Sequence, residues 1–275
     1  RVGAVSSWAP YHMSSMTAGE TWGAGGSIEN LWVAEMDFTW DSNHAHFLSV
    51  WQVHYNSIRD ANLVLDNLDN ENFSEDFKQL TEAEAHFLRG WNYAALYNWF
   101  GGVPLYTSSE DELLQPRATA EETRTFIEQE LTLAANGLPK DEPQFGRASK
   151  GTALAVLCKF YLNTKQWQKA ADAAQDVIDL QKYDLLGDYG GIFAYDNEGN
   201  QELIWVLPKD GATLTDTGQG LNALTFPPDF PMPFSSNSVF AARTYLFDDF
   251  VNSFEETDTR KDQIITEYTS TSTGE

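Results

Sequence analysis

Cysteine and basic residues are both scarce in this chain of 275 residues. One cysteine, Cys158, excludes an internal disulfide, and its place in an apolar helical pattern with Leu154 and Leu157 is typical of a small buried residue. Lys and Arg number 17 against 41 Asp and Glu, which gives a formal net charge of −24. Because such a chain repels phosphate backbones and anionic lipid surfaces, we expect no nucleic-acid partner.

Long apolar runs are also missing. No run approaches the roughly 20 consecutive apolar residues of a membrane span, and the first residues lack the basic, apolar and small-residue order of a signal peptide. The sequence does not begin with Met and ends at TSTSTGE, so we expect an internal piece of a longer protein. Its 42% of hydrophobic and 13% of aromatic residues are enough for a sizeable core.

Known catalytic motifs are absent: the sequence contains no GxSxG, HExxH, CxxC, P-loop or GxGxxG pattern. His44 and His46 lie two apart, but no third ligand follows at a helical or hairpin spacing, so we expect a solvated pair. No carboxylate stands in an apolar setting that would mark a general acid. The acidic residues therefore indicate a solvated face, and a glycosidase-like carboxylate pair stays a weaker alternative.

One acidic turn is a candidate calcium site. Asp196, Glu198 and Asn200 alternate as oxygen ligands that Ca²⁺ accepts. The segment lacks the twelfth-position Glu and the flanking helices of an EF-hand, so a simple acidic turn is the favoured interpretation. No other cofactor is indicated.

Apolar residues recur every three or four positions in several stretches, which predicts amphipathic helices. Thr81 with Glu84 forms a capping-box pattern, and Thr119 and Ser149 are further N-cap candidates. The predicted helices cover residues 46–68, 81–100, 119–136, 150–162 and 167–178. The last two match one tetratricopeptide repeat, whose small residues let antiparallel helices approach closely.

The remaining chain has no sustained period. Residues 1–42 are rich in Gly, Ser and Trp and are predicted to be loop with short strands. We expect a strand at 202–207, a long loop at 211–237, and a last helix that begins near Ser238 and includes Tyr245. The fold class is therefore mainly α: tetratricopeptide-like helix pairs form a scaffold with long loops and a few short strands.

Aromatic residues in the loops suggest a binding role, since flat rings stack on the apolar faces of sugars. For tryptophans at periodic positions we favour core packing; these are Trp51, Trp91, Trp99, Trp167 and Trp205. For the loop aromatics both sugar stacking and core packing stay open; these are Trp22, Trp32, Trp40, Phe226, Phe230 and Phe234.

Two long segments resemble one protein family. EAHFLRGWNYAALYNWFGGVPLYT, residues 84–107, resembles the "EaRFLRAyyYfdLvrlyGgvPL" signature of the SusD/RagB family of outer-membrane nutrient-binding lipoproteins. FGRASKGTALAVLCKFYLNTKQWQKAADAAQDVID, residues 145–179, is similar to its "GRatKgaAlalLArvYLyagdyekAaeyAkkVI" segment. Weaker similarity at 51–62, 201–205 and 258–260 extends the resemblance over most of residues 46–260.

The resemblance implies a non-catalytic protein that binds oligosaccharide or polysaccharide at the cell surface and delivers it to a SusC-like TonB-dependent transporter. It also implies an outer-membrane location through an N-terminal lipid anchor that lies outside this chain. The implied layout is one incomplete SusD-like domain over 1–275. Its parts are a loop-rich ligand-side segment at 1–45, tetratricopeptide-like helices at 46–182, and a mixed region at 183–275.

Binding residues follow from the same resemblance. Trp22, in Thr17-Ala-Gly-Glu20-Thr-Trp22, stands where the family's starch-binding member has its stacking tryptophan, so it is the first candidate. By position, a second aromatic cluster of the family corresponds to the loop that carries Phe226, Phe230, Phe234 and Asn237. Two alternatives from other classes stay open: a helical-repeat scaffold that binds peptide or protein, and, more weakly, a glycoside hydrolase.

Overall fold

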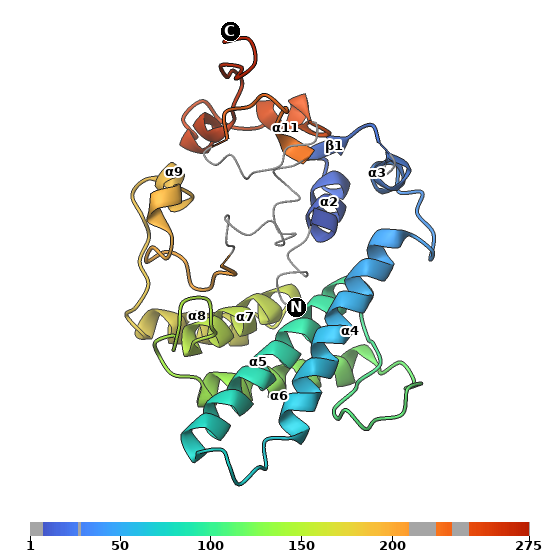
Figure 1. The fold of residues 1–275 in the computed structure, drawn as a ribbon, viewed down its shortest axis with the longest axis vertical. Helices are drawn as coiled ribbons and strands as arrows, with labels where there is room; N and C mark the ends of the chain where they lie inside the picture. The colour runs from blue at the N-terminus through green and yellow to red at the C-terminus, as the bar shows by residue number, and fades with distance from the viewer. Residues whose placement is uncertain (1–7, 27–28, 209–223, 233–241, 275) are drawn as a thin grey trace. The chain divides into compact units, whose positions relative to one another are not determined.

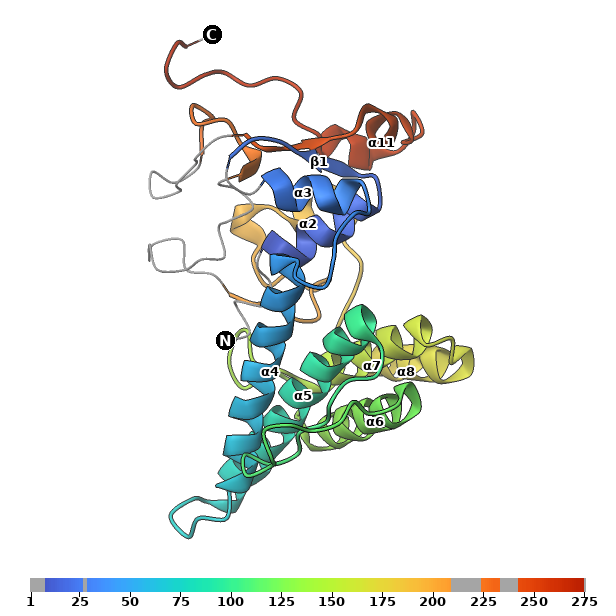
Figure 2. The same cartoon turned by 90° about the vertical axis from the view of Figure 1, so that its right-hand side faces the viewer.

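The computed structural model describes residues 8–26, 29–208, 224–232 and 242–274. The chain divides into two compact units, whose elements are drawn in Figures 1 and 2. We call residues 51–208 the helical unit, and residues 1–50 with 209–275 the mixed unit. Each unit is described by itself, and the single domain expected from the sequence stays a prediction.

Five long helices account for most of the helical unit: α4 (Ala45–Asp66), which enters the unit at Trp51, α5 (Glu75–Phe100), α6 (Ala120–Gly137), α7 (Lys150–Asn163) and α8 (Trp167–Asp179). Helix α5 packs on α6, α6 on α7, and α7 on α8, as Figure 1 shows. Their shared core is apolar and includes Phe87, Tyr93, Leu96, Ile127, Leu131, Ala153 and Phe160. The predicted helix pairs are therefore confirmed. Within the described residues, no helix has the length and apolar character needed to cross a membrane.

Side-chain caps set the starts of these helices. Thr119 and Glu122 form a capping box at α6, and the side chain of Ser149 accepts a hydrogen bond from the backbone of Thr152 at α7, as predicted. The predicted start of α5 at Thr81 is wrong. Ser74 accepts a bond from the Phe77 amide, so the helix begins at Glu75 and Thr81 lies inside it.

The end of α5 depends on two glycines. Gly101 has a φ of 71°, a conformation that favours glycine, and its amide donates to the carbonyl of Tyr97. A Cβ on Gly102 would overlap the carbonyl oxygen of Ala118. Gly102 therefore lets the segment that leads into α6 pass directly against the end of α5.

The last part of the helical unit has little regular structure. It contains the short helix α9 (Tyr189–Ile192) and the 3-10 helix η1 (Tyr195–Asn197). The predicted strand at 202–207 is wrong, because this run has no strand assignment. Its Trp205 instead packs edge-on against Phe87 and Trp91 of α5, with ring centroids 5.1 and 5.3 Å away. The apolar residues of the run thus serve side-chain packing on a helix, not pairing in a sheet.

The mixed unit contains α2 (Trp8–Thr17), β1 (Thr21–Gly23), α3 (Glu29–Met36), β2 (Thr244–Leu246), α11 (Asp248–Asn252) and the 3-10 helix η3 (Thr259–Gln263). Strands β1 and β2 pair antiparallel, with Trp22 opposite Tyr245; we call this pair the ribbon.

Two sequence predictions for the mixed unit are wrong. Residues 1–42 were expected to be loop, yet they contain α2 and α3. The buried sides of these helices mix polar residues such as His12 and Glu35 with Met13 and Trp32, so no hydrophobic period shows in the sequence. The expected last helix instead gives β2 followed by α11, while its start at Ser238 lies outside the described residues.

Candidate functional site

The outward face of the ribbon carries two stacked aromatic rings. Along β1, Thr21 and Gly23 are buried and Trp22 between them is partly exposed, as strand alternation requires. On β2 the opposite residue, Tyr245, is 40% exposed. The rings of Trp22 and Tyr245 stack with centroids 4.6 Å apart and an interplanar angle of 27°. The structure therefore presents the first candidate residue, Trp22, as half of an exposed aromatic pair.

Buried polar contacts hold the inner face of the ribbon. The hydroxyl of Thr21 bonds the hydroxyl of Ser15 at 2.8 Å, and the hydroxyl of Thr244 bonds Nε2 of His12 at 3.0 Å. Burial lowers the pKa of His12 to about 4, and the charge of His46 acts in the same direction. His12 is therefore neutral at pH 7 and serves as a hydrogen-bonding anchor for β2.

Trp32 is not a sugar platform. Its side chain is 0% exposed, and a Cβ on Gly23 would lie 2.5 Å from its ring, so the ribbon rests directly on it. A ring enclosed on both faces has no surface to offer a ligand. Sugar stacking is thus excluded for Trp32, and core packing, the other interpretation left open, is correct.

Trp40 is half-buried in a small aromatic cluster before α4. Its ring lies 5.8 Å from Phe47 in an edge-on arrangement and 5.4 Å from Phe38, which is 63% exposed. A binding role for Trp40 stays a prediction.

The second predicted cluster is described in part. Phe226 and Phe230 stack at 4.4 Å and 28°, and Tyr268 lies 5.2 Å from Phe230. Asp229 accepts hydrogen bonds from the hydroxyls of Ser270 and Tyr268, and these bonds lower the pKa of its carboxyl group. The structure therefore brings Phe226 and Phe230 together. Phe234 and Asn237 lie outside the described residues.

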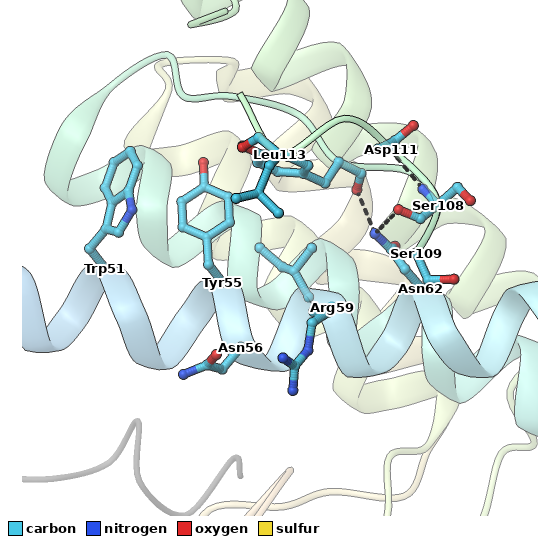
Figure 3. Close-up of a pocket in the computed structure, with 11 residues that line it drawn as sticks. Trp51, Tyr55, Asn56, Arg59, Asn62, Ser108, Ser109, Asp111 and Leu113 are labelled. Carbon is cyan, nitrogen blue, oxygen red and sulfur yellow. Dashed lines mark hydrogen bonds between the residues drawn. The ribbon is translucent and has the colours of Figure 1, made fainter. Parts of the chain in front are cut away.

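A pocket of about 350 Å³ in the helical unit was not predicted as a site (Figure 3). Helix α4 supplies Trp51 and Tyr55, which project on the same side toward Leu113. The full lining is Trp51, Tyr55, Asn56, Ile58, Arg59, Asn62, Tyr106, Ser108, Ser109, Asp111 and Leu113. Trp51, for which core packing was favoured, lies on the same face of α4 as Tyr55 and Asn62, and this spacing is the sequence signal for the pocket.

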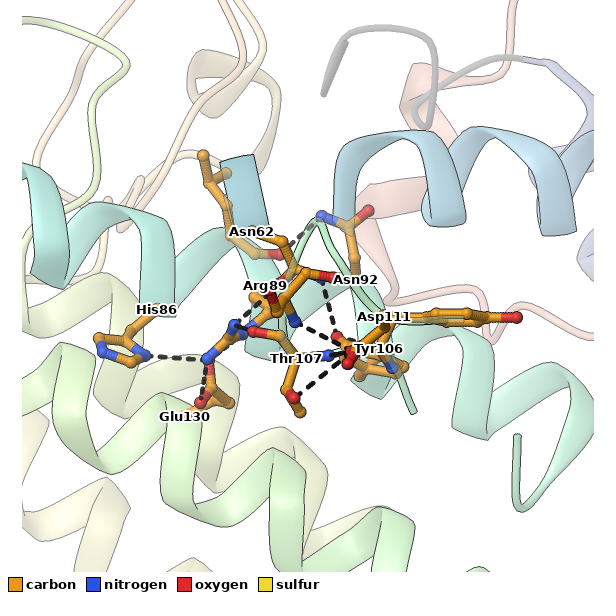
Figure 4. Close-up of polar contacts among 11 residues, drawn as sticks. Asn62, His86, Arg89, Asn92, Tyr106, Thr107, Asp111 and Glu130 are labelled. Atoms are coloured by element: carbon orange, nitrogen blue, oxygen red, sulfur yellow. Dashed lines mark hydrogen bonds and ion pairs between the residues drawn. The ribbon is translucent and has the colours of Figure 1, made fainter. Parts of the chain in front are cut away.

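A buried ion pair lies next to the pocket and holds Asn62, one of its lining residues (Figure 4). The guanidinium of Arg89 donates to both carboxylate oxygens of Glu130, at 2.6 and 2.9 Å, and to Oδ1 of Asn62 and the carbonyl of Thr107. Burial by itself would raise the pKa of Glu130, but hydrogen bonds from His86 and Arg89 and their charges outweigh it, so the pKa is lowered. Glu130 is therefore ionised and fixes Arg89 against the pocket loop.

The candidate calcium ligands do not form a closed set. Asp196 and Glu198 are exposed, while the amide of Asn200 donates to the carbonyls of Ile192 and Asn197. The side-chain oxygen of Asn200 accepts from the Glu202 amide. Asn200 thus braces the turn, and calcium binding there stays a prediction.

The expectation of a solvated histidine pair is wrong. His44 and His46 are only 6% and 3% exposed, and Nδ1 of His46 bonds the buried carboxylate of Glu35. Glu35 precedes the pair by nine and eleven residues, a spacing too irregular for a sequence pattern to reveal.

Comparisons with known proteins place the chain in a family. The family model of SusD-like proteins, described as starch-binding and associating with the outer membrane, matches residues 10–162. SusD-like protein P25 of Formosa agariphila is 31% identical over 163 residues, which are 57% of this chain and 31% of that protein. The chain therefore matches about a third of the length of this relative.

Two solved structures share the fold. Surface glycan-binding protein A from Bacteroides uniformis aligns with a TM-score of 0.78 at 24% identity, covering 94% of this chain and 60% of that one. A laminarin-binding SusD-like protein also has a TM-score of 0.78 at 24% identity, covering 95% and 63%. The helical scaffold, the sequence signatures and the family match agree: the chain belongs to the SusD-like family, whose model is described as starch-binding and associating with the outer membrane.

Proposed function

We propose that this chain binds an oligosaccharide or polysaccharide without catalysis, on the exposed face of the ribbon. The observation that carries the proposal is the stacked pair of Trp22 and Tyr245, which strand alternation directs away from the core. Flat aromatic surface beside hydrogen-bonding groups is the usual means of holding a sugar ring. The family membership and the laminarin-binding relative support the same ligand class.

A cationic donor lies at the end of the ribbon where β2 begins. Arg243 precedes the first residue of β2, and a Cβ on Gly26 would be 2.7 Å from its guanidinium nitrogen, so this group covers the Gly25–Gly26 turn. Guanidinium N–H groups are suited to bonding sugar hydroxyls. The net charge of −24 disfavours polyanionic polysaccharides, so a neutral glycan is the expected ligand class.

The test is calorimetric titration of a panel of neutral and anionic glycans. For a neutral glycan that binds, Trp22→Ala and Tyr245→Ala are each expected to weaken the affinity at least tenfold, about 1.4 kcal/mol, because each removes a stacking surface. Trp167→Ala is the matched control, since Trp167 is a 61% exposed tryptophan on α8 and its loss leaves the ribbon unchanged. Unchanged binding by Trp22→Ala would refute the assignment to the ribbon.

The pocket on α4 is the competing location. Arg59 and Asn56 line it without belonging to the hydrophobic core, so Arg59→Ala and Asn56→Ala test it with little risk to the fold. We expect both variants to bind glycan like the parent. A loss in these variants with full binding by Trp22→Ala would move the site to the pocket.

We further propose that the longer protein passes its ligand to a SusC-like TonB-dependent transporter and is held at the membrane by an N-terminal lipid anchor. The family's association with the outer membrane supports this role. The test is copurification of the full-length protein with a transporter from detergent-solubilised outer membranes. Recovery of the protein without a transporter, together with binding of peptides in place of glycans, would favour the alternative of a peptide-binding scaffold.

A further inference from the structure

We infer that Glu35, His44 and His46 form a binding site for a divalent transition metal, with Zn²⁺ as the expected ion. One ligand atom from each residue lies within 4.8 Å of the others. All three side chains are buried, with exposed fractions of 1%, 6% and 3%. This site belongs to the mixed unit and shares no residue with the proposed glycan site.

The three ligands of the proposed site come from the end of α3 and the start of α4. Glu35 lies in the last turn of α3, and His44 and His46 flank Ala45, the first residue of α4. Nδ1 of His46 bonds Oε1 of Glu35, and Nε2 of His44 lies 3.9 Å from the same oxygen. Two imidazole nitrogens and a carboxylate oxygen therefore converge on one small volume.

An independent observation indicates a missing ligand. Oε2 of Glu35 is fully buried and has no hydrogen-bond partner among the described residues. Within the same residues, no Lys or Arg forms an ion pair with Glu35. A buried carboxylate with an unsatisfied oxygen is costly, and a bound cation supplies both the charge and the missing contact.

The donor set selects the class of metal. Imidazole nitrogen with carboxylate oxygen suits Zn²⁺ and its neighbours, whereas Ca²⁺ and Mg²⁺ prefer oxygen ligands alone. Zinc bonds of about 2.0–2.2 Å place the ligand atoms about 3.4 Å apart. On binding, Nε2 of His44 would therefore move closer to Oε1 of Glu35, and Nδ1 of His46 would move away from that oxygen. Nε2 of His44 donates a hydrogen bond to the Leu31 carbonyl at 3.2 Å, and a metal on this nitrogen would replace that bond.

A metal here would join α3 to the start of α4. Trp32, on which the ribbon rests, lies one turn before Glu35 on α3. The ion would therefore stiffen the support beneath the ribbon without touching a ligand there.

The first test uses the chain freed of metal by a chelator. Titration with Co²⁺ is expected to give one equivalent bound and the visible absorption of a four-coordinate nitrogen and oxygen site. Zn²⁺ should displace the Co²⁺ and raise the melting temperature by about 5 °C, while equal Ca²⁺ or Mg²⁺ leaves it unchanged. Failure of the parent chain to bind either transition metal stoichiometrically would overturn the inference.

The second test locates the site. Glu35→Gln and His46→Asn are expected to weaken Co²⁺ binding at least tenfold, with folding checked by circular dichroism. Asp196→Asn is the control, because it removes a carboxylate from the other candidate metal segment. If Glu35→Gln does not fold, His44→Asn supplies the same readout. Retention of the Co²⁺ spectrum in folded His44 or His46 variants, or its loss in Asp196→Asn alone, would contradict this site.

Discussion

In the helical unit the buried side chains are mainly apolar, from Phe87 on α5 to Phe160 on α7. The mixed unit instead buries His12, Glu35, His44 and His46 next to a few apolar groups. An apolar core leaves a helical period in the sequence, while a polar core holds its helices by individual hydrogen bonds. The first kind of region can be located from sequence, and the second kind contains the residues that we propose for binding.

The largest expected effect on stability comes from the buried ion pair of Arg89 and Glu130 in the otherwise apolar helical unit. Arg89→Ala leaves the buried Glu130 carboxylate without its guanidinium partner, so the free energy of unfolding is expected to fall by about 3–5 kcal/mol. Urea denaturation followed by circular dichroism measures it. Arg147→Ala removes the more exposed pair with Glu84 and is expected to cost less than about 1 kcal/mol. Equal losses of unfolding free energy in both variants would show that the buried ion pair stabilises the fold no more than the exposed one.

A comparable effect is expected from the apolar centre of the mixed unit. Trp32→Ala leaves a cavity beneath the ribbon and should lower the free energy of unfolding by about 3–5 kcal/mol. Trp22→Ala, on the outer face, should cost less than about 1 kcal/mol while weakening glycan binding. Thermal denaturation of the two variants measures the difference. A stability loss of the same size from Trp22→Ala would mean that Trp22 is a core residue.

A smaller effect depends on pH. The pKa of Glu130 in the folded chain is below its ordinary value of 4.5, so its stabilisation is complete above pH 4.5 and is lost as the pH falls through the folded value. The stability difference between the parent chain and Glu130→Gln should therefore narrow as the pH drops below 4.5. Urea unfolding of both proteins from pH 7 to pH 3 tests this, and a constant difference would contradict it.

The smallest expected effect concerns a helix cap. Thr119→Ala removes the capping box of α6 and should lower the free energy of unfolding by about 1 kcal/mol. Thr119→Ser keeps the cap and should be close to the parent chain. The two variants are compared by urea denaturation, and a Thr119→Ser protein as unstable as Thr119→Ala would show that the hydroxyl does not stabilise the helix.

Prediction from sequence located the helices of the helical unit better than the elements of the mixed unit. Helices α6, α7 and α8 begin where Thr119, Ser149 and the apolar period indicate. In the mixed unit the prediction of loop missed α2 and α3, and Tyr245 was assigned to a helix. Tyr245 pairs with Trp22, which lies more than 200 positions earlier in the sequence, so no local sequence pattern could predict this strand pairing. The family resemblance indicated Trp22 as a candidate binding residue. Only the structure shows that Tyr245 stacks on it and that Trp32 is too buried to bind a sugar.

The loop over the α4 pocket keeps its backbone path through hydrogen bonds that do not involve its most exposed side chains. Four successive amides, from Tyr106 to Ser109, donate to the side chains of Tyr93, Asp111 and Asp66. Two of these four bonds end on α5 and α4, and the other two on Asp111 of the loop itself, so helix side chains and the loop's own carboxylate together set the path of a backbone that has no helix or strand of its own. Exposed neighbours such as Leu113 and Leu114, each 89% exposed, are then free to vary without altering that path. The scaffold can exchange one set of surface residues for another while its loop geometry is inherited intact.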